Sequence, residues 1–329
     1  MKQFNGVWFD EEVVTSYMQE QSCINPAIIA SGAIMSDPTI RSYLGEKGNV
    51  GTMPLFLPVD AEPDALNNDG KTNNVPTEIA NNKQTFMAIS RMKAWKERDF
   101  IKYLTGESPL QNFANQLLVA YYTIQWNRDI LAIIRGVMGV AEMASHITSV
   151  PFNSNFNIYT SIADLKQKAN GDMADGYALA FMNSFLYNEL VKMAVIEFKK
   201  YTVPNSLETV NVAYIGNTVV INVDEGTSEI NGSATTYKCY LLGRGAVLTA
   251  DKDLAYQYEV ARDPETNGGE SKLYTKQAKV LHPNGFNILS ANIVEESPTR
   301  SELGTSANWS VAFQNLKNIL IAELDVVVG

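Results

Sequence analysis

The sequence predicts an α+β fold in which strands dominate the second half of the chain. Three features carry this prediction: a long helical pattern at residues 108–139, two apolar strands around a polar segment within residues 51–100, and repeated strand–turn–strand patterns after residue 200. The chain has 329 residues, 45% hydrophobic and 19% charged, so it can bury a substantial core. That length favours about two domains.

Residues 1–50 combine short helical patches with turns and are expected to form an extended arm with little core of its own. Residues 51–100 predict a β-hairpin, because "GTMPLFLPV" is an apolar strand and "KQTFMAISRMKAW" alternates, imperfectly, apolar and polar side chains. Residues 60–82 lie between the strands and are rich in Asn, Asp, Pro and Gly. A two-stranded hairpin is marginally stable alone, so this one is expected to rest on another surface.

The long helix is expected to begin at Ser108. This residue is a suitable N-cap, Pro109 is tolerated at the first helical position, and Gln111 completes a capping box. Gly136 and Gly139 are expected to end the helix. Its apolar face consists of Leu110, Phe113, Leu117, Tyr121, Ile124, Leu131 and Ile134.

A second helix is expected at residues 176–200, and strands follow it. Three strand pairs are expected at residues 208–226, 237–250 and 258–288. The first contains a Gly-Asn turn, the second is interrupted by Gly243 and Gly245, and the third surrounds a mobile tip at Pro264–Gly269. The C-terminal residues end in an apolar strand.

Charge and hydropathy exclude several classes of protein. A formal net charge of −10 argues against a dedicated nucleic-acid binder, which needs a Lys/Arg-rich face, but it is compatible with a wall beside DNA. No apolar run reaches the length of a membrane span, and the N-terminus lacks a secretory-signal pattern. Cys23 and Cys239 make no disulfide framework, so a reducing compartment fits best.

The segment "NNDGKT" resembles two ligand loops and satisfies neither. A phosphate loop ending in Gly70-Lys71-Thr72 needs a glycine where Ala65 stands, and a helix cannot start at the following "NNVPT". A calcium loop would place Ala65 at its first ligand position and Pro76 at its bidentate glutamate. The segment is therefore interpreted as a flexible polar tip.

No catalytic, cofactor or metal site is predicted. His146, His282 and the two cysteines have no ligand-type spacing, and the sequence lacks the motifs of serine hydrolases, zinc proteases and dinucleotide-binding folds. His282 belongs to "HPNGF", where Pro283, Asn284 and Gly285 favour a turn between two strands. We interpret this histidine as an architectural residue.

The order of these elements resembles the major capsid proteins of tailed bacteriophages, which have the Hong Kong 97-type fold. The segments that carry the resemblance span most of the chain and each is weak alone. They are "NDGKTNN", "SRMKAWKERDFIKYLTGESPLQNFANQLLVAYY", "NTVVINVD", "YLLGRGAVL", "ARDPETNGG", "LHPNGF" and "SPTRSELGTSANW".

The resemblance implies a division of the chain into the parts of a shell subunit. These are an N-terminal arm (1–50), an extended loop hairpin (51–100), the spine helix of a peripheral domain (101–142), a mainly axial domain (143–255), and mainly peripheral strands with the C-terminus (256–329). The loop would lie over a neighbouring subunit.

The implied function is self-assembly into pentamers and hexamers of an icosahedral or prolate head that encloses double-stranded DNA without sequence-specific binding. A separate scaffolding protein and a portal protein are implied partners, and decoration proteins are optional ones. The chain would be assembled in the host bacterial cytoplasm and end in the virion capsid. No cofactor, no membrane and no enzymatic activity are implied.

Two sets of residues are expected to matter. The inter-subunit contact of the loop is expected at Asn67, Asn68, Asp69, Gly70, Lys71 and Thr72. The structural anchors are expected at Trp95, Tyr121, Trp126 and Trp309, with Phe100 beside Trp95 at the hairpin base and Leu131 on the spine. Lys71 and Lys83 are the loop lysines that an inter-subunit crosslink could use, although the sequence identifies no acceptor.

Two other functions compete with the phage-head interpretation. A cellular nanocompartment shell of the encapsulin type has the same fold and encloses an enzyme, so DNA content distinguishes the two. A soluble enzyme with a cryptic site would form a small discrete oligomer and need a cluster of convergent polar groups.

Overall fold

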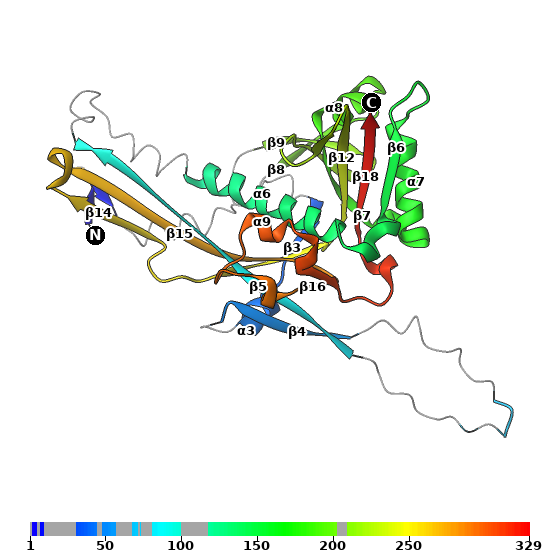
Figure 1. Cartoon of the computed structure of the whole chain (residues 1–329), viewed down its shortest axis with the longest axis horizontal. Coiled ribbons are helices and arrows are strands. Elements are labelled where there is room, and N and C mark those ends of the chain that lie inside the picture. The colour runs from blue at the N-terminus through cyan, green and yellow to red at the C-terminus, as the bar shows by residue number, and fades with distance from the viewer. Residues whose placement is uncertain are drawn as a thin grey trace.

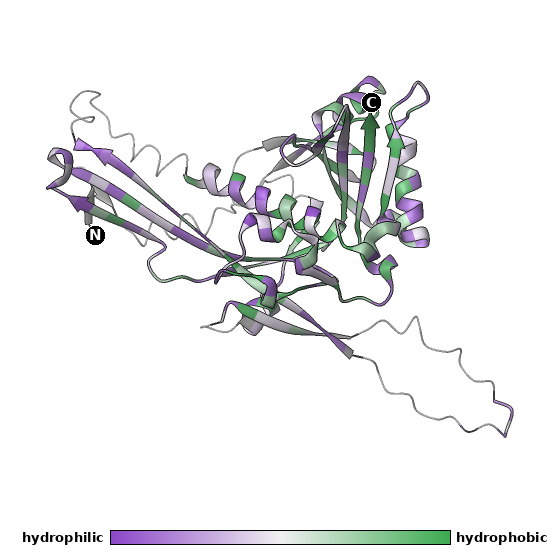
Figure 2. Cartoon of the chain, in the orientation of Figure 1, coloured by the Kyte–Doolittle hydropathy of each residue, from purple (hydrophilic) through white to green (hydrophobic). Residues whose placement is uncertain are grey.

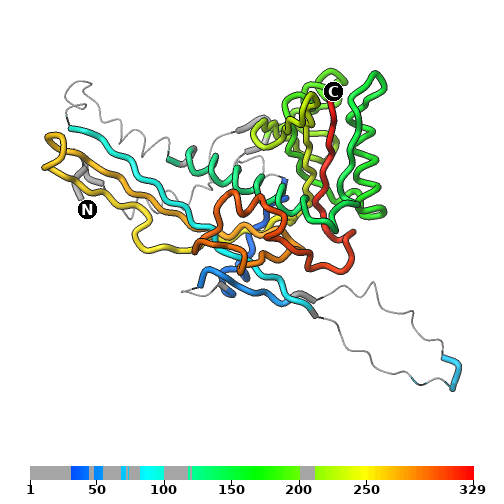
Figure 3. The backbone as a smooth tube through the Cα atoms, in the orientation of Figure 1, coloured from blue at the N-terminus to red at the C-terminus, as the bar shows by residue number. Residues whose placement is uncertain are grey.

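The computed structural model describes residues 2–4, 7–9, 31–44, 48–56, 68–71, 73, 81–99, 118–202 and 209–329. Two β-sheets form separate lobes with a long helix between them, and the edge of the smaller sheet extends into a projecting hairpin (Figure 1). The chain passes between the lobes at residues 139–146, 243–247 and 312–320, as the backbone trace shows (Figure 3). The fold is α+β, as the sequence predicts.

The larger sheet has eight strands in the order β6-β18-β12-β7-β10-β9-β8, with β11 paired to β12. Its strands are β6 (Ile147–Pro151), β7 (Tyr177–Met182), β8 (Glu197–Thr202), β9 (Thr209–Ile215), β10 (Thr218–Asn222), β11 (Ser228–Asn231), β12 (Ala234–Gly243) and β18 (Ile321–Val328). Helices α7 (Ile158–Asn170) and α8 (Ser184–Lys192) pack on one face, and the long helix covers part of the other. The predicted Gly-Asn hairpin is confirmed as β9 and β10.

The predicted helix at residues 176–200 is wrong. This segment forms β7, α8 and β8 in succession. All six residues of β7 are buried, so its apolar run lacks the alternation of a half-buried strand and cannot be distinguished from a buried helix by pattern. Helix α7 was not predicted, although Asn157 caps it by accepting bonds from Tyr159 N and Thr160 N.

The smaller sheet has the order β3-β13-β15-β5-β4, with β14 paired to β15. Its strands are β3 (Ile34–Ser36), β4 (Val50–Phe56), β5 (Asn81–Arg98), β13 (Val247–Lys252), β14 (Tyr258–Asp263) and β15 (Glu270–Pro283). The 18 residues of β5 span roughly 60 Å at about 3.4 Å per residue. The hairpin predicted within residues 51–100 is confirmed as β4 with β5, and the pairing around residues 264–269 as β14 with β15.

The long helix, α6, is described from Leu118 to Met138. The predicted start at Ser108 lies outside the described residues. Gly136 does not end the helix as predicted: it lies inside α6, and a Cβ atom there would be 2.1 Å from the Leu303 carbonyl oxygen. Residues 129–134 of α6 are all buried, because this part of the helix packs between the two sheets.

Gly243 and Gly245 do not interrupt a strand pair. Strands β12 and β13 belong to different sheets, and the glycines lie in the segment that joins the lobes. The apolar C-terminal strand is confirmed as β18, but it lies in the larger sheet and not with the other strands that follow residue 256. Figure 2 shows its apolar residues beside those of β12 and β7.

The remaining elements are short. The strands are β1 (Lys2–Phe4), β2 (Val7–Phe9), β16 (Phe286–Ile288) and β17 (Trp309–Val311), and the helices are α3 (Pro38–Leu44) and α9 (Arg300–Leu303). The 3₁₀ helices are η3 (Ala141–His146), η4 (Gly171–Gly176), η5 (Thr266–Gly268), η6 (Ser290–Asn292), η7 (Ser306–Asn308) and η8 (Leu316–Asn318). Strands β1 and β2 pair with each other, as do β16 and β17.

Candidate assembly interface

The hairpin of β4 and β5 projects from the body of the molecule (Figure 1). Its strands β4 and β5 pair from Val50 with Met87 to Phe56 with Asn81. The described part of its tip, Asn68–Lys71, is exposed and lies far from both sheets (Figure 1). Asp69 Oδ1 accepts a bond from Lys71 N at 2.8 Å. Asn67 and Thr72 lie outside the described residues.

The root of the hairpin is held by a row of amides. Gln84 is buried on β5, and its Nε2 donates to Asn284 Oδ1 at 3.3 Å. Asn82 Nδ2 donates to the Ala312 carbonyl at 2.9 Å, and Thr85 N donates to Asn287 Oδ1 at 2.8 Å. Such bonds fix the direction in which β5 leaves the body, because each satisfies a polar group that a shift of the strand would expose or leave unpaired.

His282 belongs to this root and is architectural, as the sequence predicts. It lies near the end of β15, is buried, and its Nε2 lies 3.1 Å from Gln84 Oε1. Its ring also packs at a tilt against Phe86, with the centroids 5.9 Å apart. Burial lowers the pKa of this imidazole to about 3, so the ring is neutral and must donate from Nε2 to the Gln84 oxygen.

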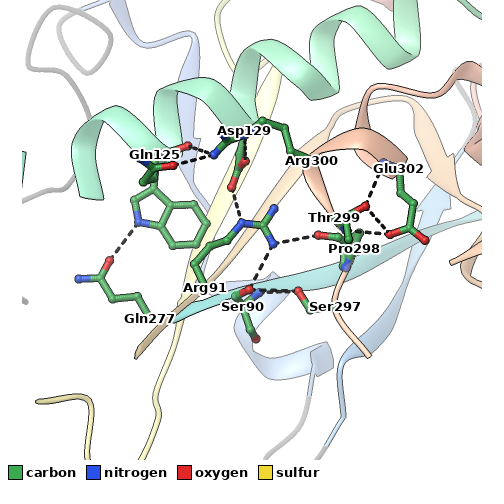
Figure 4. A network of polar contacts seen from close by, with 11 residues as sticks. Ser90, Arg91, Gln125, Asp129, Gln277, Ser297, Pro298, Thr299, Arg300 and Glu302 are labelled. Carbon is green, nitrogen blue, oxygen red and sulfur yellow. Dashed lines mark hydrogen bonds and ion pairs between the residues drawn. The ribbon is translucent and has the colours of Figure 1, made fainter. Parts of the chain in front are cut away.

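A second network joins β5 to the spine helix (Figure 4). Asp129 of α6 is completely buried and accepts from Arg91 Nε of β5 at 2.9 Å and from Arg300 Nε of α9 at 2.8 Å. One carboxylate therefore ties together three segments that are distant in sequence. Two guanidinium groups on a single buried carboxylate leave neither of its oxygens unpaired, which is the condition for tolerating a buried charge.

The segment before α9 completes this network. Arg91 Nη1 donates to the Pro298 carbonyl at 2.9 Å, and Arg300 Nη2 donates to Gln125 Oε1 at 2.9 Å. Ser90 N donates to Ser297 Oγ at 2.7 Å. Thr299 and Glu302 form a capping box that starts α9 and orients Arg300. The segment 297–303 thus buttresses β5 against α6.

Three of the predicted aromatic anchors join α6 to the smaller sheet. Trp95 of β5 meets Tyr121 edge to face, with the ring centroids 5.4 Å apart. Trp126 is completely buried, and its Nε1 donates to Gln277 Oε1 of β15 at 3.0 Å. Tyr122, which was not singled out, is more deeply buried than Tyr121 and contacts Thr275 Oγ1 at 2.7 Å. Phe100 lies outside the described residues.

Trp309, the fourth expected anchor, lies on the short strand β17 and not on β18. It is buried on β17, and its Nε1 donates to the Leu303 carbonyl at 2.8 Å. A Cβ on Gly136 would lie 2.7 Å from this nitrogen, so the absence of a side chain there lets α6 approach both Trp309 and the end of α9.

Sequence reasoning missed the buried ions and amides, which were Gln84, Arg91, Asp129 and Arg300. One signal was available for Asp129, because it lies three residues after Trp126 and four before Ile133, on an apolar stripe other than the predicted one. A charged side chain on such a stripe needs a buried partner. Which arginines would supply it depends on contacts between segments more than 35 residues apart, which a single sequence does not reveal.

The other reactive side chains of the described residues include a buried cysteine and a second buried histidine. Within the described ranges, no set of three or more His, Cys, Asp or Glu side chains could hold a metal ion. Cys239 is buried, and burial raises the pKa of its thiol to about 12. His146 is buried, and burial lowers its pKa. In the same ranges no helix has the length and apolarity needed to span a membrane.

Comparisons with known proteins show which sequences and folds this chain resembles. No protein-family model matches the sequence. The major capsid protein of Bacillus phage SPP1 is 23% identical over 311 residues, which cover 93% of each chain. The capsid of Ralstonia phage GP4 superposes with a TM-score of 0.56 at 12% identity and covers 89% of this chain and 86% of that one.

Two further solved structures have similar folds. A chain of Microbacterium phage Oxtober96 gives a TM-score of 0.51 at 10% identity and covers 99% of this chain and 95% of that one. A chain of Mycobacterium phage Bobi gives 0.51 at 10% identity, with 92% and 90% covered. The chain therefore has the Hong Kong 97-type capsid fold, and its sequence is similar to that of the major capsid protein of Bacillus phage SPP1.

Proposed function

We propose that this chain is a major capsid protein and that copies of it build the shell of a phage head. The observation that carries the proposal is the agreement of sequence and fold over nearly the whole chain with capsid proteins. The location that follows is the virion capsid. The related proteins are structural, and they do not favour a nanocompartment shell or a soluble enzyme.

The finer assembly is part of the same proposal. The subunits form pentamers and hexamers of a closed head around double-stranded DNA. The lobe built from α6 and the smaller sheet is the peripheral domain, and the larger sheet is the axial domain, with β18 included. The net charge of −10 is consistent with an inner shell surface to which packaged DNA does not bind tightly.

The hairpin of β4 and β5 is proposed to contact a neighbouring subunit through residues 67–72. Three observations support this role: the described tip is exposed, its strands are pinned at the root by Gln84 and His282, and β5 continues into the network around Asp129. A hairpin that is firmly held at one end and unsupported at the other is suited to overlap a second copy. Repetition of one such heterologous contact closes a ring.

The proposed partners are other copies of the chain, a separate scaffolding protein and a portal protein, with decoration proteins as optional additions. Assembly takes place in the host bacterial cytoplasm. The test is to express the chain with and without the scaffolding gene of its own genome and to examine purified material by electron microscopy. Closed shells or capsomer-sized rings are expected, and DNA within native particles separates a phage head from a nanocompartment. A monodisperse monomer or dimer under all these conditions would contradict the proposal.

A further inference from the structure

A buried cluster of charges lies on the last strand of the larger sheet. Lys238 of β12 stands directly opposite Asp325 of β18, and Tyr240 stands opposite Glu323, so the four side chains share one face of the sheet. Lys238 Nζ donates to Glu323 Oε1 at 2.5 Å and lies 3.3 Å from Asp325 Oδ1. The exposed fractions of the side chains are 15% for Lys238, 5% for Glu323 and 19% for Asp325.

The cluster has one cation for two carboxyl groups. Glu323 and Asp325 are two residues apart on one face of β18, so both carboxyl groups face the single ammonium group of Lys238. Burial, together with the charge of Asp325, raises the pKa of Glu323 to about 7, although Lys238 opposes the shift. The carboxyl group of Glu323 therefore gains or loses its proton close to neutral pH.

The elements around the pair do not supply a second compensating cation. On β12, Lys238 is the ion-pair partner of both carboxylates, and among the described residues no other cation forms an ion pair with them. Tyr240 is completely buried, and its hydroxyl has no hydrogen-bond partner within the described part of the chain. Arg135 of α6 acts on Tyr240 only through its charge, and Glu229 of β11 adds a third acid, 3.7 Å from Lys238. Strand β6, on the other side of β18, has no titratable residue.

We propose that the buried carboxyl group of Glu323 takes up a proton near neutral pH and that this proton controls how firmly β18 is held in the sheet. Loss of the proton leaves two adjacent carboxylates facing one lysine in a site that excludes most water. Strand β18 lies between β12 and β6, and in the described structure β6 pairs with no other strand. The protonation state therefore also governs the attachment of β6 to the rest of the sheet. This inference does not depend on the proposed function.

The size of the effect follows from the linkage between proton binding and folding. Glu323 has an ordinary pKa of 4.5 and a pKa of about 7 in the folded chain, so the folded state binds the proton more tightly. The stabilisation is fully present below the ordinary pKa and is lost as the pH rises through 7. Between pH 6 and pH 8 the equilibrium constant for opening β18 is expected to increase about tenfold.

The test is hydrogen exchange followed by mass spectrometry on the full chain between pH 6 and pH 8. Labelling times are scaled for the intrinsic pH dependence of amide exchange, and peptides covering Ile321–Val328 are compared. The wild type is expected to lose about tenfold in protection across this range. The variant Glu323→Gln, which mimics the protonated acid, is expected to show no loss. The matched control is Glu229→Gln, which removes the exposed acid near the same lysine and is expected to behave as the wild type.

Two results would overturn the proposal. One is wild-type protection of β18 that does not change from pH 6 to pH 8, and the other is a Glu323→Gln variant that keeps the tenfold loss. A second measurement covers the case in which the variant fails to fold. Infrared difference spectra of the wild type across this pH range are expected to show the loss of one protonated carboxyl group, and spectra without such a band would equally overturn the proposal.

Discussion

Arg91 and Asp129 form a 2.9 Å ion pair between β5 and α6, and the Asp129 side chain is completely buried. The same carboxylate accepts from Arg300, so the projecting strand, the spine helix and α9 meet at one charge. A hairpin that projects from the body needs this kind of support, because tertiary contacts and not its own two strands must hold its direction.

Replacement of Asp129 by Asn should destabilise the chain by about 3–5 kcal/mol, because two partly buried guanidinium groups would lose their common buried anion. Urea unfolding followed by circular dichroism measures this change. The matched control is Glu225→Gln, which breaks the exposed 2.7 Å pair with Arg128 on the same helix and should cost about 1 kcal/mol or less. Equal effects of the two substitutions would show that the Asp129 network does not support the spine.

Gly136→Ala should also destabilise the chain. In an exposed helix this substitution would stabilise by about 1 kcal/mol through helix propensity. In α6 the new methyl group would lie 2.1 Å from the Leu303 carbonyl and 2.7 Å from Trp309 Nε1, so the helix must move away from α9 and β17. Thermal unfolding shows directly whether the substitution raises or lowers the stability of the chain. An increased melting temperature would contradict the close approach of α6 to α9 and β17.

Acid should weaken the root of the hairpin through His282. Its pKa is lowered from 6.5 to about 3 by burial, so only the unfolded chain takes up the proton between these values. The stabilisation is present above pH 6.5 and is lost as the pH falls towards 3, by about 1.4 kcal/mol per pH unit. Unfolding free energies at pH 7 and pH 5 should differ less in His282→Gln than in the wild type. His146 has a pKa lowered in the same direction and is unchanged in both proteins, so the difference isolates His282. An unchanged pH dependence in the variant would contradict a buried neutral imidazole.

Deletion of residues 66–75 should leave a folded subunit that assembles poorly. The deleted residues include the exposed tip and none of the root contacts of Gln84, Asn82 or Thr85. Circular dichroism should therefore match the wild type, while negative-stain images should show few closed shells. If this deletion variant formed normal shells, the hairpin tip would not be part of the contact between subunits.

The sequence predicted those parts of the fold that have a local signal. The β4–β5 hairpin, the Gly-Asn hairpin and the C-terminal strand have turn residues and alternation or apolar runs that can be identified within a short window. The prediction was wrong at residues 176–200, because the completely buried β7 has no polar alternation. The pairing of β12 with β18 joins residues about 90 positions apart, a separation that no local pattern encodes.

The candidate site was predictable only in part. The polar composition of residues 60–82 identified the tip, and Trp95, Tyr121 and Trp126 were found from their size and spacing. The buried polar contacts of Gln84, Asp129 and Arg300 were not found, since each bond joins segments that only the fold brings together. Glycines were interpreted as terminators, whereas Gly136 is required by the close approach of a neighbouring segment.

The most direct test of this account is a cryo-electron microscopy map of assembled particles in which the residues around Asn68–Lys71 can be traced. The account predicts that the tip of each β4–β5 hairpin lies against a neighbouring subunit, while its root keeps the contacts with His282 and Asn284 of its own chain. Closed shells in which every tip extends into solvent or folds back on its own subunit would contradict the central claim.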